Sequence, residues 1–113
     1  MRFRDLDIWQ RSKQLAVNVY RTTDSLKNYG FKDQITRSIL SVPSNIAEGF
    51  EKDYTKEKYR FLTIAKGSLA EFVTQVEIGI EVGFIERELG SGWIQEGEEL
   101  SKMIGKMMVN LKY

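Results

Sequence analysis

Three acidic side chains in the second half of the chain have types and spacing that could do chemistry. Glu71, Glu77 and Glu81 fall on one long helical stretch, and Glu77 and Glu81 are one helical turn apart. Carboxylates with this spacing could bind a divalent cation or act in acid–base catalysis, but either role needs partner groups that converge from a second helix. We therefore interpret the three glutamates as solvated surface charges, and we expect no metal site.

Histidine and cysteine are both absent from the sequence. Di-iron bundles need Glu-x-x-His motifs, c-type haem needs Cys-x-x-Cys-His, and zinc sites and catalytic triads draw on the same two residue types. All of these sites are therefore excluded. The glycines match neither a phosphate-binding loop nor a dinucleotide fingerprint. We expect a non-enzymatic protein that carries no cofactor.

Four apolar stripes with helical spacing predict four helices, at residues 5–27, 32–50, 55–83 and 91–111. No alternation typical of strands occurs between them. The expected breaks are Asn28-Tyr29-Gly30, Glu51-Lys52-Asp53, and Gly83 with Gly90, Ser91 and Gly92. Short connections between long helices favour an all-α, antiparallel up-down-up-down four-helix bundle, and the length suits one domain, residues 1–113.

Pro43 lies inside the second predicted helix and cannot donate a backbone hydrogen bond. The helix could kink at Pro43, or it could end near Ser41 and restart with the proline in its first turn. The apolar stripe keeps its phase across the proline, which favours a kinked helix. In the third helix, Gly67 and Gly79 each cost about 1 kcal/mol relative to alanine, so we expect a neighbouring backbone to approach closely there.

The composition is that of a globular protein, with 42% hydrophobic and 29% charged residues. No stretch approaches the roughly 20 apolar residues of a membrane span, and the first residues lack the apolar region of a secretory signal. The expected location is the cytoplasm, with no membrane partner.

Charge is unevenly distributed along the chain. Residues 1–60 hold 12 Lys/Arg and 8 Asp/Glu, a net charge of +4, whereas residues 61–113 hold 5 and 8, a net charge of −3. Basic residues of the first two helices could therefore contact RNA or DNA phosphates. These candidates are Arg2, Arg4, Arg11, Lys13, Lys32 and Arg37. The alternative is a protein–protein adaptor that docks its partner through Phe3, Trp9 and Phe31.

The apolar stripes are wider than the core of one four-helix bundle needs. Trp9 and Tyr20 flank the stripe of the first helix, and Met103, Met107 and Met108 widen that of the fourth. Left exposed, such residues would form a patch that soluble monomers rarely tolerate. The pattern therefore predicts a homo-oligomer, unless the bundle's own core consumes every one of these side chains.

One segment is not explained by helical periodicity alone. Residues 41–49 read Ser-Val-Pro-Ser-Asn-Ile-Ala-Glu-Gly. Further segments of the same kind are Asp5-Leu6-x-x-Trp9, Tyr20, Gln34-x-x-Arg37-Ser38 and Ala65-x-Gly67-Ser68-Leu69-x-Glu71. Together these segments resemble the four-helix-bundle proteins of the 23S rRNA intervening-sequence family, over nearly the whole chain.

The resemblance implies a left-handed four-helix bundle that assembles as a ring-shaped homopentamer, in a family without an established enzymatic activity. Some members are encoded inside intervening sequences of bacterial 23S rRNA genes. A related branch contains the accessory variability determinant of diversity-generating retroelements, whose basic pentamer binds nucleic acid and a reverse transcriptase. The net charge of +1 of this chain departs from that basic branch.

The polar residues of the motif also have a structural interpretation. Where Pro43 leaves a carbonyl without its donor, nearby polar groups can hydrogen-bond the backbone. We expect a polar network that fixes the second helix against the third, with a ligand or partner site as the alternative. Its candidate members are Ser41, Ser44, Asn45, Glu48, Ser68 and Glu71. Arg37 and Glu71 are candidates for an ion pair between the two helices.

Overall fold

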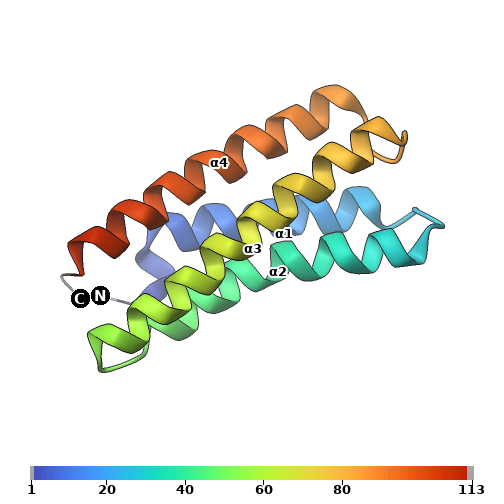
Figure 1. Ribbon diagram of the computed structural model, residues 1–113. Helices are drawn as coiled ribbons and strands as arrows, with labels where there is room; N and C mark the ends of the chain where they lie inside the picture. The colour runs from blue at the N-terminus through green and yellow to red at the C-terminus, as the bar shows by residue number, and fades with distance from the viewer. Residues whose placement is uncertain (1, 112–113) are drawn as a thin grey trace.

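Four helices make up the computed structural model of the protein, which describes residues 2–111. They are α1 (Asp7–Thr23), α2 (Tyr29–Phe50), α3 (Thr55–Glu81) and α4 (Arg87–Asn110), preceded by a short 3₁₀ turn, η1 (Phe3–Asp5). In Figure 1 each helix runs opposite to the one before it, and both termini lie at the same end of the bundle. No strand occurs within residues 2–111. The prediction of an all-α four-helix bundle is confirmed.

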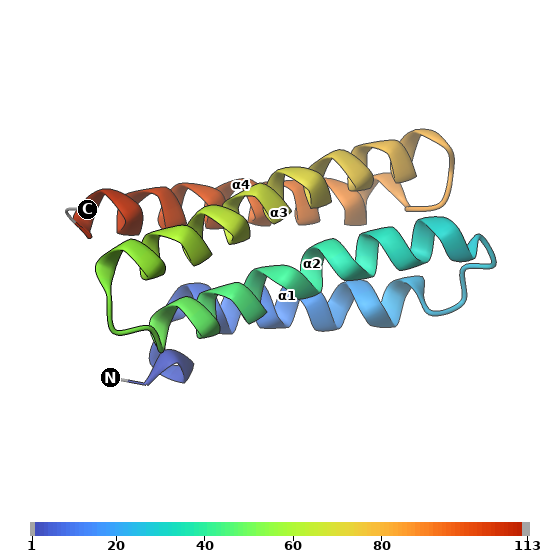
Figure 2. The ribbon, with the colours of Figure 1, turned by 60° about the horizontal axis from the view of Figure 1, so that its bottom comes forward.

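Each helix packs against the next one in the chain, and α4 also packs against α1. Figure 2 shows α1 and α2 in one layer and α3 and α4 in the other. The resulting rod measures 43 × 21 × 19 Å. None of the helices within residues 2–111 is both long and apolar enough to cross a membrane.

One continuous core runs between the two layers. Its largest fully buried side chains are Phe72, Ile35, Ile39, Ile46, Leu69, Leu100 and Ile104. Burial of each such side chain stabilises the fold by about 1.5–3 kcal/mol. Ile8, Leu15 and Val19 of the first predicted stripe are also buried. Leu26, assigned to the same stripe, lies beyond the end of α1 in the connection to α2.

Helix α2 continues through Pro43 from Tyr29 to Phe50, and the proline ring is buried. Of the two alternatives at this proline, the structure shows the uninterrupted helix, and the break near Ser41 is wrong. The kink itself stays a prediction.

The first connection differs from the prediction, because α1 already ends at Thr23. Asn28 caps the start of α2: its side-chain oxygen accepts a hydrogen bond from the N–H of Phe31 at 3.0 Å. Asparagine is among the residues best suited to this N-cap position. Asn28-Tyr29-Gly30 is therefore the start of the second helix, not the stop of the first.

The last connection also differs from the prediction. Gly83 makes the turn with a φ of 84°, as expected for a glycine in the left-handed region. Helix α4 then begins at Arg87, capped by the Glu86 carboxylate at 3.3 and 3.0 Å. Gly90, Ser91 and Gly92 therefore lie inside the helix, and their assignment to the break is wrong.

Close packing explains why Gly79 and Gly90 are glycines, but it does not explain Gly67. A Cβ on Gly90 would lie 2.5 Å from the Ile80 side chain, and one on Gly79 would lie 2.6 Å from that of Ile85. Both glycines let side chains, rather than a backbone, approach. Gly67 has no neighbour within 4 Å of a Cβ position, so the predicted close approach does not occur there.

Candidate nucleic-acid interface at one end of the bundle

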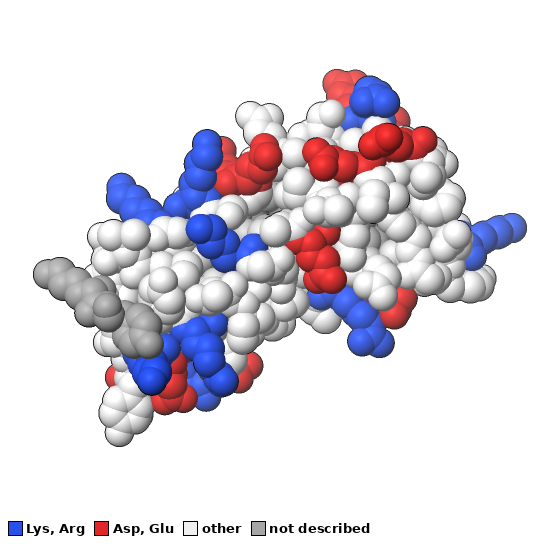
Figure 3. Space-filling view, in the orientation of Figure 1, with Lys and Arg blue, Asp and Glu red and all other residues white. Residues whose placement is uncertain are grey.

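The fold sorts charge along the long axis of the bundle. The contact of Ser41 with Ser68 and that of Arg11 with Glu99 mark the middle of the rod. We call residues 2–13, 42–66 and 100–111 the basic end, since they hold eleven Lys/Arg and six Asp/Glu, a net charge of +5. Residues 14–41 and 67–99, the acidic end, hold five and ten, a net charge of −5. In Figure 3 the blue side chains gather toward the end where the termini lie, and most red ones lie over the other half of α3 and α4.

Three of the six predicted phosphate contacts, Arg2, Arg4 and Lys13, lie at the basic end, and two of them lie beside aromatic rings. The Arg4 guanidinium lies 4.8 Å from the centroid of the Phe3 ring, and Lys13 Nζ lies 5.4 Å from that of Trp9. The two rings meet edge to face with centroids 5.2 Å apart. Arg2 is exposed at the start of the same segment. The turn η1 and the start of α1 thus present cations and aromatic faces together.

The connection from α2 to α3 adds cations that sequence reasoning missed. Lys52 and Arg60 lie 5.2 and 5.1 Å from the centroid of the Phe61 ring. The other basic residues of this end are Lys56, Lys58, Lys66, Lys102 and Lys106. A bundle of four antiparallel helices brings the α2–α3 turn and the end of α4 back to the N-terminus. The order of helices could therefore have indicated this grouping.

Arg11 serves a different purpose from the predicted one. Its guanidinium donates hydrogen bonds to Glu96 at 2.6 and 3.0 Å and to Glu99 at 2.8 Å, while Asp7 lies 3.8 Å away. The bonds to Glu96, and then those to Glu99, raise the pKa of Arg11 above its ordinary value. Arg11 is partly buried between α1 and α4, and its charge is already balanced. It ties the two helices together and is not placed to bind a phosphate.

Lys32 and Arg37 lie on α2 at the acidic end, away from the other candidates. Lys32 Nζ donates to the Asp24 carbonyl at 2.9 Å. Arg37 Nε donates to the Asp33 carboxylate at 3.0 Å within the same helix. The structure therefore does not bring the six predicted residues into one surface.

Part of the predicted polar network is present between α2 and α3. The hydroxyls of Ser41 and Ser68 are 2.9 Å apart. The Asn45 amide donates to the Ser41 carbonyl at 2.7 Å and to the Ser41 hydroxyl at 2.9 Å. Asn45 thus bonds a carbonyl in the turn that contains Pro43, although the carbonyl that Pro43 leaves without its donor is that of Ile39, four residues back. These three residues fix the register of the two helices at mid-bundle.

The other predicted members stay outside this network. Ser44, Glu48 and Glu71 are exposed. The pair of Arg37 with Glu71 is wrong, since Arg37 bonds Asp33 and no cation within residues 2–111 lies within ion-pair distance of Glu71. A second bridge that the sequence did not reveal joins the same helices: the Ser38 hydroxyl donates to Gln75 Oε1 at 2.7 Å.

Gly49, the last residue of the motif, lies where α2 meets the start of α3. A Cβ there would lie 2.8 Å from the Cβ of Phe61, which is closer than real Cβ atoms come. The glycine therefore allows the tight turn between the two helices. Glu77 and Glu81 are exposed on α3, and no three acidic groups of the described chain converge in a way that could hold a metal ion.

The fold and the motif define a class of small four-helix-bundle proteins. The family model for 23S rRNA-intervening sequence protein matches residues 4–106. The chain belongs to this family.

A crystal structure of a protein with unknown function from the S23 ribosomal protein family of Bacteroides thetaiotaomicron VPI-5482 has a similar fold. Its TM-score is 0.84 at 23% identity, over 89% of this chain and 97% of that one. At this identity the likeness concerns the fold alone. No curated protein matches the chain.

Proposed function

We propose that this protein is a non-enzymatic, cytoplasmic, homo-oligomeric scaffold that binds nucleic acid through its basic end. The net charge of +5 at one end of the rod, or +4 without Arg11, which Glu96 and Glu99 balance, is the observation that supports this function. A whole-chain charge of +1 conceals it, because the opposite charge lies at the far end of a 43 Å molecule. The centres of the two halves are roughly half that length apart, which is more than twice the Debye length of about 8 Å at physiological ionic strength, so a polyanion at the basic end is largely screened from the acidic end.

The contacting residues in this proposal differ from those expected from the sequence. Arg2, Arg4 and Lys13 remain, and Lys52, Lys56 and Arg60 join them. Because Arg4 and Lys13 lie beside the partly exposed rings of Phe3 and Trp9, the surface favours single strands, whose bases can stack on ring faces. Binding through phosphates and ring faces does not depend on base sequence.

Assembly strengthens this binding. Tyr20, Leu40 and Ile78 expose 42%, 48% and 50% of their surface in the single chain. A second subunit would remove such residues from water. In a closed ring every subunit is equivalent, so the basic ends repeat around the axis and their attraction for one long polyanion adds up. We take five subunits from the family resemblance.

The subunit contact that the charges favour joins unlike surfaces. The groove between α1 and α2, lined by Val17, Tyr20, Leu40 and Pro43, has Arg21 on its border. The acidic half of α3 and α4 from a neighbouring subunit complements this cation. Such a head-to-tail contact generates a ring if its rotation closes.

Titration of a fluorescent single-stranded RNA and of a duplex DNA tests the nucleic-acid part of the proposal. We expect micromolar or weaker binding to the single strand that does not depend on base sequence. The affinity should fall steeply between about 50 and 200 mM salt, because binding to phosphates releases counterions. Undetectable binding at 50 mM salt by the intact oligomer would contradict it.

The adaptor function is the second candidate, and the exposed α1–α2 groove favours it. Phe3 and Trp9 pack on each other, and Phe31 packs on Phe84 with ring centroids 5.2 Å apart. Phe31 is thus engaged within the chain, and Phe3 and Trp9 belong to the nucleic-acid surface of the first proposal. Tyr20 and Leu40 replace them as the docking residues in this alternative.

A further inference from the structure

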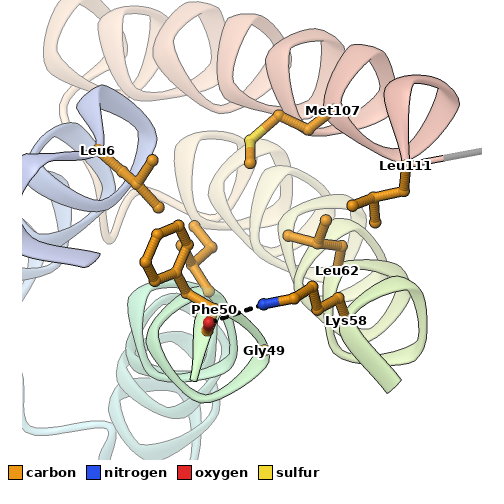
Figure 4. Close-up of a pocket in the computed structure, with 8 residues that line it drawn as sticks. Leu6, Gly49, Phe50, Lys58, Leu62, Met107 and Leu111 are labelled. Carbon is orange, nitrogen blue, oxygen red and sulfur yellow. Dashed lines mark hydrogen bonds between the residues drawn. The ribbon is translucent and has the colours of Figure 1, made fainter. Parts of the chain in front are cut away.

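An apolar pocket opens at the basic end of the bundle, where α2, α3, the end of α4 and Leu6, the residue before α1, form its wall. It encloses about 230 Å³. Its apolar lining comes from Leu6, Ile46, Phe50, Leu62, Met107 and Leu111. Figure 4 shows side chains around a common space, with Leu6 on one side, Leu62 and Leu111 on the other, and Met107 reaching in from α4. None of the six residues assigned to nucleic acid lines this pocket.

Among the described residues that line this pocket, Lys58 is the one charged side chain. Its Nζ donates to the Phe50 carbonyl at 2.9 Å, the bond drawn as a dashed line in Figure 4. Lysine has three N–H donors and this bond uses one, so two remain for an anion. The bond also holds the half-buried ammonium at the pocket wall, so a ligand need not order it.

We propose that this pocket binds a small anionic amphiphile, with its apolar chain among the four helices and its carboxylate on Lys58. The size follows from the volume: a cavity of about 150 Å³ lined by such residues holds a benzene molecule, so 230 Å³ suits a chain of about six to eight carbons. This inference does not rest on the proposed function.

The positive charge around the pocket favours a ligand with an anionic head group. The pocket lies in the end of the bundle with a net charge of +5, which attracts an anion and repels a cation. A neutral molecule of the same shape would gain the burial of its chain but not the charge-assisted hydrogen bond to the ammonium. An apolar chain with a carboxylate therefore matches both parts of the site, whereas an alcohol or an amine matches one.

Calorimetric titration of the intact protein with octanoate, 1-octanol and octylamine tests the ligand class. We expect octanoate to bind most tightly, octanol about tenfold more weakly, and octylamine not at all. From hexanoate to octanoate, each added methylene should strengthen binding about fourfold. Decanoate should gain nothing further, since the pocket is then full. Absence of saturable octanoate binding, or an affinity that keeps rising through decanoate, would overturn the proposal.

Two lysine variants provide the matched comparison. Lys58→Met should weaken octanoate about tenfold and leave octanol within twofold. Lys56→Met removes the same charge from an exposed site outside the pocket and should leave both ligands within twofold. Equal loss in the two variants would show that overall charge, not Lys58, holds the carboxylate, and would contradict the assignment.

Methyl NMR on the unmodified protein locates the ligand without relying on any variant. Octanoate should shift the methyl signals of Leu6, Leu62 and Met107 in proportion to its occupancy. The methyls of Leu40, in the exposed α1–α2 groove, should not move. Shifts at Leu40 in place of the pocket methyls would overturn the proposal.

Discussion

The Arg11 guanidinium lies 2.6 Å from Glu96 Oε1, and this ion pair joins the first helix to the last. The side chains of Arg11 and Glu96 are 28% and 30% exposed, so the pair is only partly screened by water. Arg11 also bonds Glu99, which places one cation between two carboxylates. Arg11 is therefore a structural residue at the basic end. Its substitution should lower the stability of the fold without weakening nucleic-acid binding.

Arg11→Ala should lower the free energy of unfolding by about 1–2 kcal/mol, because the partly buried Glu96 and the exposed Glu99 lose their charged donor. It should leave RNA affinity within twofold. Lys13→Ala, two residues along and exposed, should behave in the opposite way, with stability within about 0.5 kcal/mol and weaker RNA binding. Urea unfolding and RNA titration of both variants check this. If Arg11→Ala loses RNA binding but keeps its stability, Arg11 contacts nucleic acid and the structural role is wrong.

Gly49→Ala should destabilise the protein by about 1–3 kcal/mol, since the added Cβ meets the Cβ of Phe61, which cannot move without the α3 backbone. The matched control is Gly67→Ala, where the new methyl meets open space. That change should stabilise the fold by up to about 1 kcal/mol through helix propensity. Thermal or urea unfolding measures both. Equal effects of the two substitutions would contradict the packing account.

Asn45→Ala should cost about 1–2 kcal/mol, because it removes two hydrogen bonds, to the Ser41 carbonyl and to the Ser41 hydroxyl, in the turn around Pro43. Ser44→Ala, an exposed change one residue away, should stay within about 0.5 kcal/mol. Urea unfolding measures both variants. If Asn45→Ala costs no more stability than Ser44→Ala, the motif is a partner site and not a structural network.

Leu40→Glu should break the oligomer without unfolding the subunit, because it puts a carboxylate where the proposed contact brings the acidic half of a neighbour. Val109→Glu is the control, at a side chain 78% exposed near the end of α4. Light scattering should give about five times 13.1 kDa for the unmodified protein and the control, and 13.1 kDa for Leu40→Glu. A mass of 13.1 kDa for the unmodified protein, unchanged on concentration, would rule out the ring.

The sequence predicted the four helices well because each carries a long apolar stripe. It predicted their ends less well, because single capping or turn residues determine where a helix begins and ends. Asn28 looked like part of a stop, yet its side chain caps the next helix. Gly90 and Gly92 looked like a break, yet Gly90 packs on Ile80 within α4 and Gly92 meets nothing. Only the position of a neighbouring helix distinguishes a packing glycine from a turn glycine.

The candidate interface was only partly predictable for a similar reason. Charge counted along the chain separates residues 1–60 from 61–113, whereas the antiparallel fold interleaves the two segments. Lys52 and Arg60 come to the N-terminal end, while Lys32 and Arg37 of the same segment go to the opposite one. Arg11 looked like any other basic residue, because its carboxylate partners lie 85 and 88 positions away.

The central claim is that nucleic acid binds at one end of the rod, and paired charge reversal tests it most directly. Lys56→Glu with Arg60→Glu alters the basic end, and Lys32→Glu with Arg37→Glu makes the same change of charge on α2 at the acidic end. The measurement is the affinity for single-stranded RNA as a function of salt. We expect the first pair to weaken binding at least tenfold and to reduce the slope of log K against log salt by about 1.4, the value for two lost phosphate contacts on a single strand. The second pair should change affinity less than threefold. Equal losses from the two pairs would contradict a binding surface at the basic end.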